Sequence, residues 1–337
     1  MFVTDYTKHL LDHVKKIHFI GCGGSGMYPL IQILNAKGYV ISGSDVLDGS
    51  IIQYEREMGV KVSLGHSADN VIGTDLVVYS AAISKDNVEL NAAASYGIPT
   101  VERSVLLGYV SRLYKDSICV SGTHGKTTTT SMITTALELA GRDPSAVIGG
   151  KLPAINAYGR YGHSQNFVCE SCEYNNTFLH MNPDIAVVLN IDRDHLDFFG
   201  DLEHIQEAFI KFANKATRTV IYNGDDANTV EAMAQVTGKK MITFGTGDHC
   251  DWQAKNIHVP GGFHSDYDVY HNGQFLCHAE ICVPGAHNIL NSLAAFAAAY
   301  ESGAKPEDIC RGLKDFHGAH RRFELTGTYC GVTFADD

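Results

Sequence analysis

The chain has 337 residues, enough for two domains, and with 45% hydrophobic and 19% charged residues it has the composition of an ordinary globular protein. The net charge of −12 argues against a general nucleic-acid or membrane-surface binder, although a phosphate site built on local backbone dipoles stays compatible with it. No apolar run approaches the length of a membrane span, and no signal peptide is evident at the start. The nine cysteines are scattered through apolar runs, so we expect reduced thiols in a cytoplasmic protein.

Short strands alternate with helices over the first hundred residues. Strands are predicted at residues 16–20, 39–44, 60–62, 76–79 and 100–101, and helices at residues 27–34, 50–58 and 89–96. This alternation predicts a Rossmann-like α/β domain, a parallel sheet covered on both faces by helices, which we assign to residues 1–114.

A glycine-rich turn joins the first strand to the first helix. It comprises Gly21, Gly23, Gly24, Ser25 and Gly26, in the pattern Gly-x-Gly-x-x-Gly. In this setting the glycines let backbone N–H groups approach a diphosphate at the helix N-terminus, and Asp45 lies where an acidic residue would bind a ribose hydroxyl. From the pattern alone, NAD, FAD, another nucleotide or a turn without a ligand all stay open.

A polar stretch at residues 111–116 precedes a second α/β series. Strands are predicted at residues 117–120, 167–169, 185–189, 219–222 and 241–244, and helices at residues 131–139, 204–213, 227–235, 294–300 and 306–313. An Asn-Gly pair predicts an antiparallel β-hairpin over residues 268–276. We therefore predict a P-loop α/β ATPase domain with an extra hairpin over residues 115–322, followed by one or two strands within 323–334.

The second series opens on a phosphate-loop pattern. A small-residue turn that ends in Gly125-Lys126-Thr127 stands between a strand and a helix, as in proteins that bind a triphosphate. The lysine would reach the outer phosphates, and the Thr127 hydroxyl would reach magnesium. The generic pattern has a glycine where this chain has Val120, so the loop is a shorter variant. The alternative is a tight turn that only starts a helix.

Two acidic segments follow strands of the second series. In the first, residues 169–174, Glu173 is a candidate magnesium ligand, because such ligands occur at strand ends beside a phosphate loop. Cys169 and Cys172 of the same segment form a C-x-x-C, which could instead indicate zinc or redox chemistry. In the second, residues 190–197, His195 could hold a second divalent ion, or the segment could be a helix cap and a solvated turn.

Two later segments are candidate nucleotide contacts. Residues 284–291 open a helix with polar groups that include Asn288. Residues 318–323 place two arginines at a domain edge, where Arg322 could clamp a phosphate. Capping or a surface ion pair explains either segment equally well.

Taken together, these segments resemble the Mur ligases of peptidoglycan synthesis over essentially the whole chain. The most specific matches are residues 18–27, 42–45, 122–129, 190–195, 285–291 and 321–323. The shortened phosphate loop is this family's form. The family usually has aspartate where Cys172 stands, so a supporting carboxylate is missing here.

The resemblance implies an ATP-dependent ligation, and within the family the chain is most similar to members that join L-alanine to UDP-N-acetylmuramate. ATP would phosphorylate the lactyl carboxylate, and the alanine amine would then displace phosphate. By resemblance, ATP would be bound by Gly122, Thr123, His124, Gly125, Lys126, Thr127, Thr128, Asn288 and Arg322. The UDP-sugar would be bound by Gly21, Gly23, Gly24, Ser25, Gly26, Asp45 and His66. Mg²⁺ would be held by Thr127, Glu173 and His195, and the catalytic residues would be Lys126, Glu173 and His195.

The family pattern continues beyond residue 337 with a third domain that carries the amino-acid site, and residues 323–337 would be its first strands. We therefore expect this polypeptide to bind nucleotides but not to ligate alanine at a useful rate. The competing hypotheses are a non-catalytic nucleotide-binding or sensing module and an NAD-dependent oxidoreductase. No nucleic-acid or membrane partner is expected.

Overall fold

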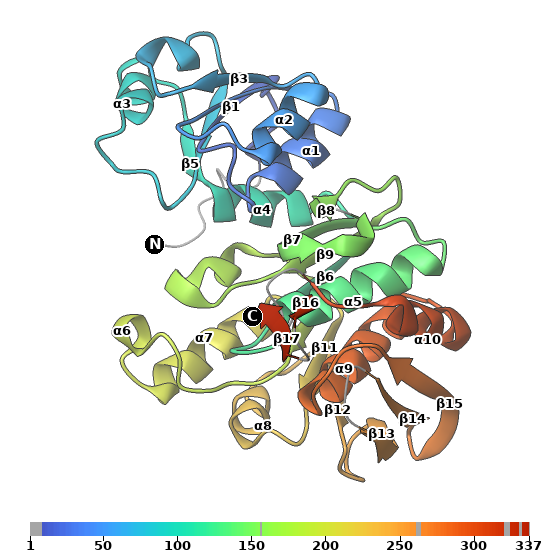
Figure 1. Ribbon diagram of the computed structural model, residues 1–337. Helices are drawn as coiled ribbons and strands as arrows, with labels where there is room; N and C mark the ends of the chain where they lie inside the picture. The colour runs from blue at the N-terminus through green and yellow to red at the C-terminus, as the bar shows by residue number, and fades with distance from the viewer. Residues whose placement is uncertain (1–8, 156, 261–263, 320–323, 330–331, 337) are drawn as a thin grey trace.

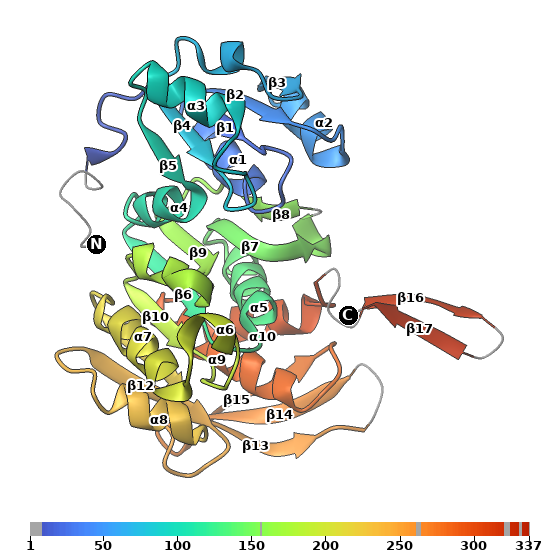
Figure 2. The same ribbon diagram turned by 90° about the vertical axis from the view of Figure 1, so that its left-hand side faces the viewer.

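The structure is a computed structural model that describes residues 9–155, 157–260, 264–319, 324–329 and 332–336. Two β-sheets with their helices form the upper and lower parts of the molecule, and the third, two-stranded sheet projects from one side (Figures 1 and 2). Within the described ranges, no helix combines the length and the apolar character that crossing a membrane requires.

The first sheet has five parallel strands in the order β3-β2-β1-β4-β5. They are β1 (Lys16–Ile20), β2 (Val40–Asp45), β3 (Lys61–Leu64), β4 (Leu76–Tyr79) and β5 (Thr100–Glu102). The helices are α1 (Tyr28–Ala36), α2 (Ser50–Glu57), α3 (Val88–Ser95), α4 (Arg103–Ser111) and a 3-10 helix at Ala68–Val71. The strand order reverses beside β1, and open α/β sheets bind ligands at such a point, so the glycine-rich turn after β1 lies at the expected ligand site.

The second sheet has ten strands in the order β15-β14-β13-β12-β11-β10-β6-β9-β7-β8. Its parallel part consists of β13 (Trp252–His258), β12 (Lys240–Gly245), β11 (Thr219–Asn223), β10 (Ile185–Val188), β6 (Asp116–Ser121), β9 (Asn166–Glu170) and β7 (Ser145–Leu152). Antiparallel strands complete it at both edges, namely β8 (Ala157–Arg160), β14 (Ser265–His271) and β15 (Gln274–Ile281). The α/β class and the extra hairpin are thereby confirmed, and Asn272 and Gly273 both have the positive φ of a type I′ turn.

Helices cover both faces of this second sheet (Figure 1). They are α5 (Lys126–Leu139), α6 (Leu196–Phe199), α7 (Leu202–Asn214), α8 (Ala227–Met233), α9 (His287–Glu301) and α10 (Pro306–Asp315), with 3-10 helices at Pro153–Ile155 and Tyr174–His180. A separate antiparallel pair, β16 (Glu324–Tyr329) and β17 (Val332–Asp336), ends the described chain. The chain passes from the first sheet to the second between β5 and β6. The exact domain boundaries at residues 114 and 322 stay predictions.

Helix α5 begins at Lys126, five residues before the predicted start. The threonines that follow the phosphate loop are weak helix formers, because their hydroxyls compete for backbone groups. Here that competition is resolved inside the helix: the Thr130 hydroxyl donates to the Lys126 carbonyl at 2.8 Å, and the Thr134 hydroxyl donates to the Thr130 carbonyl at 2.8 Å. Both threonines are fully buried. The helix therefore extends to the loop and directs its N-terminus at the site.

Glu55 on α2 is a fully buried carboxyl group whose two oxygens have no hydrogen-bond partner of normal geometry. Burial raises the pKa of Glu55 from 4.5 to about 8; the Cys22 thiol opposes the shift, and the Asp45 carboxylate adds to it. Glu55 is therefore protonated at neutral pH. Its contribution to stability is fully present below the unfolded pKa and is lost as pH rises through the folded value.

We expect Glu55→Gln to remove this pH dependence, because the amide stays neutral where the carboxyl must ionise. The free energy of unfolding of the unaltered chain should fall by about 1 kcal/mol per pH unit between roughly pH 5.5 and 7.5, relative to the variant. Urea unfolding over this range measures the difference. Glu57→Gln, an exposed change on the same helix, is the control. Parallel pH profiles for the chain and Glu55→Gln would contradict the assignment.

Candidate functional site

The phosphate loop, residues 122–125, joins β6 to α5 and is held from the end of β10. The backbone N–H of Thr123 donates to the Asn190 carbonyl at 3.0 Å, and that of His124 donates to the Asn190 side-chain oxygen at 2.8 Å. Gly125 has a φ of 85°, and a Cβ at this position would overlap the side-chain oxygen of Asn291 on α9. The loop is thus fixed in shape, with the α5 N-terminus behind it.

Lys126 and Glu173 form a largely buried ion pair beneath this loop. The Lys126 ammonium donates to the carbonyls of Gly122 and Thr123 at 2.6 and 3.0 Å and lies 2.9 Å from a Glu173 carboxylate oxygen. The Glu173 side chain is only 3% exposed. The lysine charge is therefore held at the loop by one carboxylate and two carbonyls.

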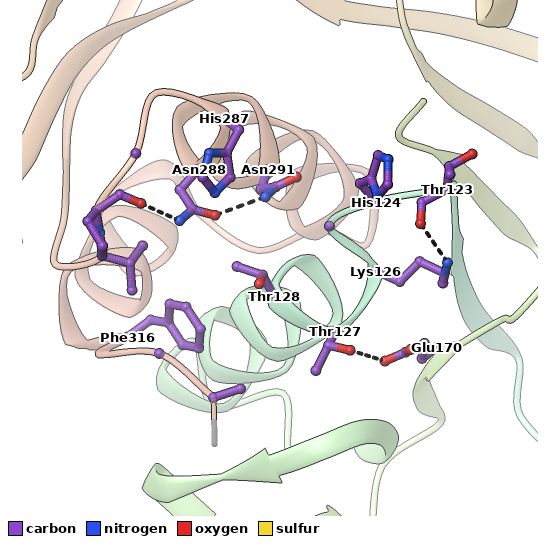
Figure 3. Close-up of a pocket in the computed structure, with 16 residues that line it drawn as sticks. Thr123, His124, Lys126, Thr127, Thr128, Glu170, His287, Asn288, Asn291 and Phe316 are labelled. Atoms are coloured by element: carbon purple, nitrogen blue, oxygen red, sulfur yellow. Dashed lines mark hydrogen bonds between the residues drawn. The ribbon is translucent and has the colours of Figure 1, made fainter. Parts of the chain in front are cut away.

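Thr127 faces Glu170, the last residue of β9, at the wall of the site (Figure 3). The Thr127 hydroxyl donates to a Glu170 carboxylate oxygen at 2.8 Å, and the backbone N–H of Gly149 donates to the same oxygen at 2.9 Å. A side chain at Gly149 would overlap this carboxylate. Glu170 belongs to the acidic segment in which only Glu173 was predicted as a ligand, although Glu170 offered a signal: it ends the strand beside β6 and is paired in register with Val120, just before the loop.

His195 lies near the same ion pair. Its Nε2 is 4.0 Å from a Glu173 oxygen, and its ring packs against Tyr174 with ring centroids 4.8 Å apart. The residue has a φ of 50° and precedes α6, but its side chain makes no capping hydrogen bond. The structure thus brings the predicted residues Lys126, Glu173 and His195 together.

A cavity of about 440 Å³ opens over the phosphate loop (Figure 3). Its lining consists of residues 123–128, Glu170, residues 283–285, His287, Asn288, Asn291, Phe316, Gly318 and Ala319. Asn288 donates to the Pro284 carbonyl at 2.6 Å and accepts from Asn291 at 2.9 Å, so it both braces its turn and lines the cavity. The predicted contact Arg322 lies outside the described residues.

The glycine-rich turn of the first sheet is held by the end of β2. The N–H groups of Gly21 and Cys22 donate to the Ser44 carbonyl at 2.8 and 3.1 Å, and that of Gly23 donates to the Asp45 carboxylate at 3.0 Å. The other Asp45 oxygen accepts from the Leu47 N–H at 3.0 Å. The Asp45 carboxylate therefore fixes the backbone of the glycine-rich turn through its hydrogen bond to Gly23.

His66 joins a buried network behind this turn. Its Nδ1 is 3.0 Å from a carboxylate oxygen of Glu89, which also accepts from the Ser44 hydroxyl at 2.6 Å. Burial alone would raise the pKa of Glu89, but the nearby His18 ring and hydrogen bonds from Ser44 and Asn70 outweigh it and lower that pKa to about 2. Glu89 is thus a buried anion that orients His66, and the sequence prediction missed it.

A second cavity, of about 290 Å³, lies between the two sheets and reaches the glycine-rich turn. Ser25, Gly26 and Arg103 line it on one side, and Gly149 and Glu170 are among its lining residues on the other. The Arg103 guanidinium packs against Gly26, 3.3 Å from where a Cβ would stand. Glu170 lines both cavities, so this residue is a shared part of their walls.

The C-x-x-C alternative gains no support from the structure. Cys169 is fully buried with its sulfur 3.4 Å from that of Cys119, whereas Cys172 is exposed. In the part of the chain that the structure describes, neither cysteine belongs to a group of three potential metal ligands.

Comparison with protein families identifies two consecutive matches. The model described as "Mur ligase family, catalytic domain" matches residues 16–115, and "Mur ligase middle domain" matches residues 120–299. The first match covers the five-stranded sheet with its helices, and the second covers nearly all of the ten-stranded sheet and its helices up to α9.

Curated relatives match across nearly the whole chain. The UDP-N-acetylmuramate–L-alanine ligase of Caldanaerobacter subterraneus subsp. tengcongensis is 43% identical over 97% of this chain, and that of Acetivibrio thermocellus is 42% identical over 96%. The chain spans 71% and 69% of their lengths, respectively.

Solved structures agree with these matches. The UDP-N-acetylmuramate–alanine ligase MurC from Thermotoga maritima superposes with a TM-score of 0.82 at 28% identity, covering 96% of this chain and 74% of that one. The UDP-N-acetylmuramate:L-alanyl-γ-D-glutamyl-meso-diaminopimelate ligase from Neisseria meningitides gives a TM-score of 0.80 at 27% identity, covering 91% of this chain and all of that one.

Proposed function

This chain belongs to the Mur ligase family, and on that premise we propose that it serves the ATP-dependent ligation of L-alanine to UDP-N-acetylmuramate in peptidoglycan precursor synthesis. The observation that carries the proposal is that two cavities, one over a phosphate loop and one at a glycine-rich turn, share Glu170 as a lining residue. A ligase needs this arrangement, because the phosphoryl donor and the carboxylate acceptor must touch. The cytoplasmic location expected for this chemistry is part of the proposal.

The donor side of the site suits ATP. Backbone N–H groups of the loop and the N-terminus of α5 would bind the phosphates, with Lys126 at the outer ones. The donor and the acceptor carboxylate are both anionic and repel each other, so a fixed cation at their junction lowers the barrier. Lys126 is held for this role by Glu173 and by two loop carbonyls.

The oxygen donors at the junction suit Mg²⁺. Thr127 supplies a hydroxyl and Glu170 a carboxylate, 2.8 Å apart and both facing the nucleotide cavity; hard oxygen ligands of this kind bind Mg²⁺. Glu173 and His195 are the candidates for a second ion. When bound, Mg²⁺ would neutralise phosphate charge.

The proposed chemistry has two transfers. A lactyl carboxylate oxygen attacks the γ-phosphorus, the bond from that phosphorus to the bridging oxygen breaks, and ADP leaves. The alanine amine then attacks the acyl carbon. The bond between that carbon and the phosphate oxygen breaks, phosphate leaves, and the nitrogen loses a proton. This chain's own contribution is to position both anions and to offset their charge.

Calorimetric titration tests the proposal against a nicotinamide-dependent enzyme. UDP-N-acetylmuramate should bind with one site per chain, and NADH should neither bind comparably nor displace it. Tighter binding of NADH would defeat the ligase assignment and favour the oxidoreductase alternative.

Arg103→Ala should weaken UDP-N-acetylmuramate binding by roughly 10- to 100-fold, because a charge-assisted contact to a diphosphate or carboxylate is lost. Arg103 packs on Gly26 and lines the second cavity, which is the proposed site of the UDP-sugar acceptor. Among the described residues, Arg103 has no ion-pair partner. Uridine, which lacks both anionic groups, should bind the variant and the unaltered chain equally. The control is Arg112→Ala, an exposed change at the other end of α4. Unchanged acceptor affinity in Arg103→Ala would refute this role.

A further inference from the structure

Three side chains of metal-binding type converge at the carboxyl ends of β11 and β12. Asp225 follows β11, and His249 and Cys250 lie in the turn between β12 and β13. Their ligand atoms all lie within 4.8 Å of one another, and no other such group of three occurs in the described ranges. None of the three lines either of the cavities described above.

The spacing suits one tetrahedral ion. The His249 Nε2 lies 3.5 Å and the Cys250 sulfur 3.7 Å from the same oxygen of Asp225, Oδ1. With metal–ligand bonds of about 2.0–2.3 Å, neighbouring ligands of a tetrahedral zinc site stand roughly 3.3–3.8 Å apart. Both distances fall in that range without any movement of the backbone.

Three glycines clear the space that these side chains occupy. A Cβ on Gly224 would lie 2.7 Å from the Cys250 sulfur, and a Cβ on Gly245 would lie 2.7 Å from the Asp225 carboxylate. A Cβ on Gly247 would overlap the His249 ring. The backbone around the group therefore admits the three ligands only because side chains are absent at all three positions.

The ligands are also oriented and accessible. The second Asp225 oxygen accepts hydrogen bonds from the N–H and the hydroxyl of Thr246, which fixes the carboxylate and directs Oδ1 at the other two ligands. Cys250 is 3% exposed, whereas the His249 side chain is 64% exposed, so an ion can enter from solvent. On binding, Nε2 of His249 would exchange its 2.9 Å hydrogen bond to the Gly224 carbonyl for the ion.

We propose that Asp225, His249 and Cys250 form a site for a divalent ion of the zinc type, separate from the magnesium chemistry of the nucleotide site. Thiolate, imidazole and carboxylate together favour Zn²⁺ or Co²⁺ over Mg²⁺, and a water molecule would fill the fourth position. Binding replaces the thiol proton of Cys250, which leaves to solvent.

Cobalt titration of the metal-free full chain, in excess Mg²⁺, tests the proposal. Co²⁺ should bind once per chain, with the intense visible bands of a tetrahedral site and a sulfur-to-cobalt charge-transfer band, and Zn²⁺ should displace it. Cys250→Ser should remove the charge-transfer band and lower the affinity by more than about tenfold. Absence of tetrahedral cobalt binding in the unaltered chain would overturn the proposal.

Two further variants keep the result interpretable. His249→Gln alters a mostly exposed side chain, so it should stay folded by circular dichroism and still lose at least about tenfold in affinity. Cys172→Ser removes an exposed thiol beside Glu173 and should leave the spectrum unchanged. A charge-transfer band that survives in Cys250→Ser or disappears in Cys172→Ser would place the ion elsewhere and refute the site.

Discussion

Lys126→Ala is expected to lower the affinity of the chain for ATP by roughly two to three orders of magnitude. The ammonium group is held at the phosphate loop by the Gly122 and Thr123 carbonyls, so its position does not depend on the ligand. Each charge-assisted hydrogen bond to a phosphate contributes about 1.5–3 kcal/mol, and the alanine variant loses all of them. Calorimetric titration with a non-hydrolysable ATP analogue measures the loss.

The same change also leaves the carboxylate of Glu173, only 3% exposed, without its cation. Removal of one partner from a buried ion pair is strongly destabilising, so Lys126→Ala alone should unfold at lower urea concentration. The double variant Lys126→Ala/Glu173→Gln should recover stability but not ATP binding. Lys211→Ala, an exposed change on α7, serves as the control. Near-normal ATP affinity in the stabilised double variant would contradict the role of Lys126.

Gly125→Ala is expected to destabilise the chain by about 2–5 kcal/mol and to abolish ATP binding. Two effects add: a φ of 85° is costly for a residue with a Cβ, and that Cβ would overlap the Asn291 side chain. Relief of the overlap must move the start of α5 and with it the N–H groups that face the cavity. Urea unfolding and ATP titration measure the two consequences.

Gly38→Ala separates the two effects. Gly38 has a similar φ of 92°, but a Cβ there would meet nothing within 4 Å, so only the conformational cost of about 1–2 kcal/mol should appear. Asn291→Ala in the Gly125→Ala background should recover the stability lost to the overlap, but not the stability lost to the unfavourable φ. Equal destabilisation by Gly38→Ala and Gly125→Ala would show that the Asn291 contact is unimportant.

Local pattern predicted most of the fold. The strand predicted at residues 76–79 is β4 to the residue, because an apolar run between turn residues leaves few alternatives. Strand β7 was missed, since its Gly149 and Gly150 break the apolar run. Helix α4 was missed because its polar end coincides with the boundary between the two α/β series, where we expected a linker.

The candidate site was predicted less completely, for reasons of distance in the sequence. The phosphate loop is a local pattern, so it could be found by reading along the chain. Glu170 and Arg103 take part only because the two sheets place distant segments on one cavity, and no local pattern reports that. The sequence favoured Glu173 in the acidic segment, and its role as a magnesium ligand stays a prediction; the structure pairs Glu173 with Lys126 and places Glu170 against Thr127.

The central claim, that donor and acceptor sites are distinct and lie on either side of Glu170, is tested most directly by one titration. UDP-N-acetylmuramate is titrated into the chain after saturation with a non-hydrolysable ATP analogue and Mg²⁺. The account predicts one acceptor bound per chain with the analogue still in place, and an acceptor affinity at least as high as in the absence of Mg²⁺. Displacement of the analogue by UDP-N-acetylmuramate would mean that both nucleotides share one site, and it would contradict the account.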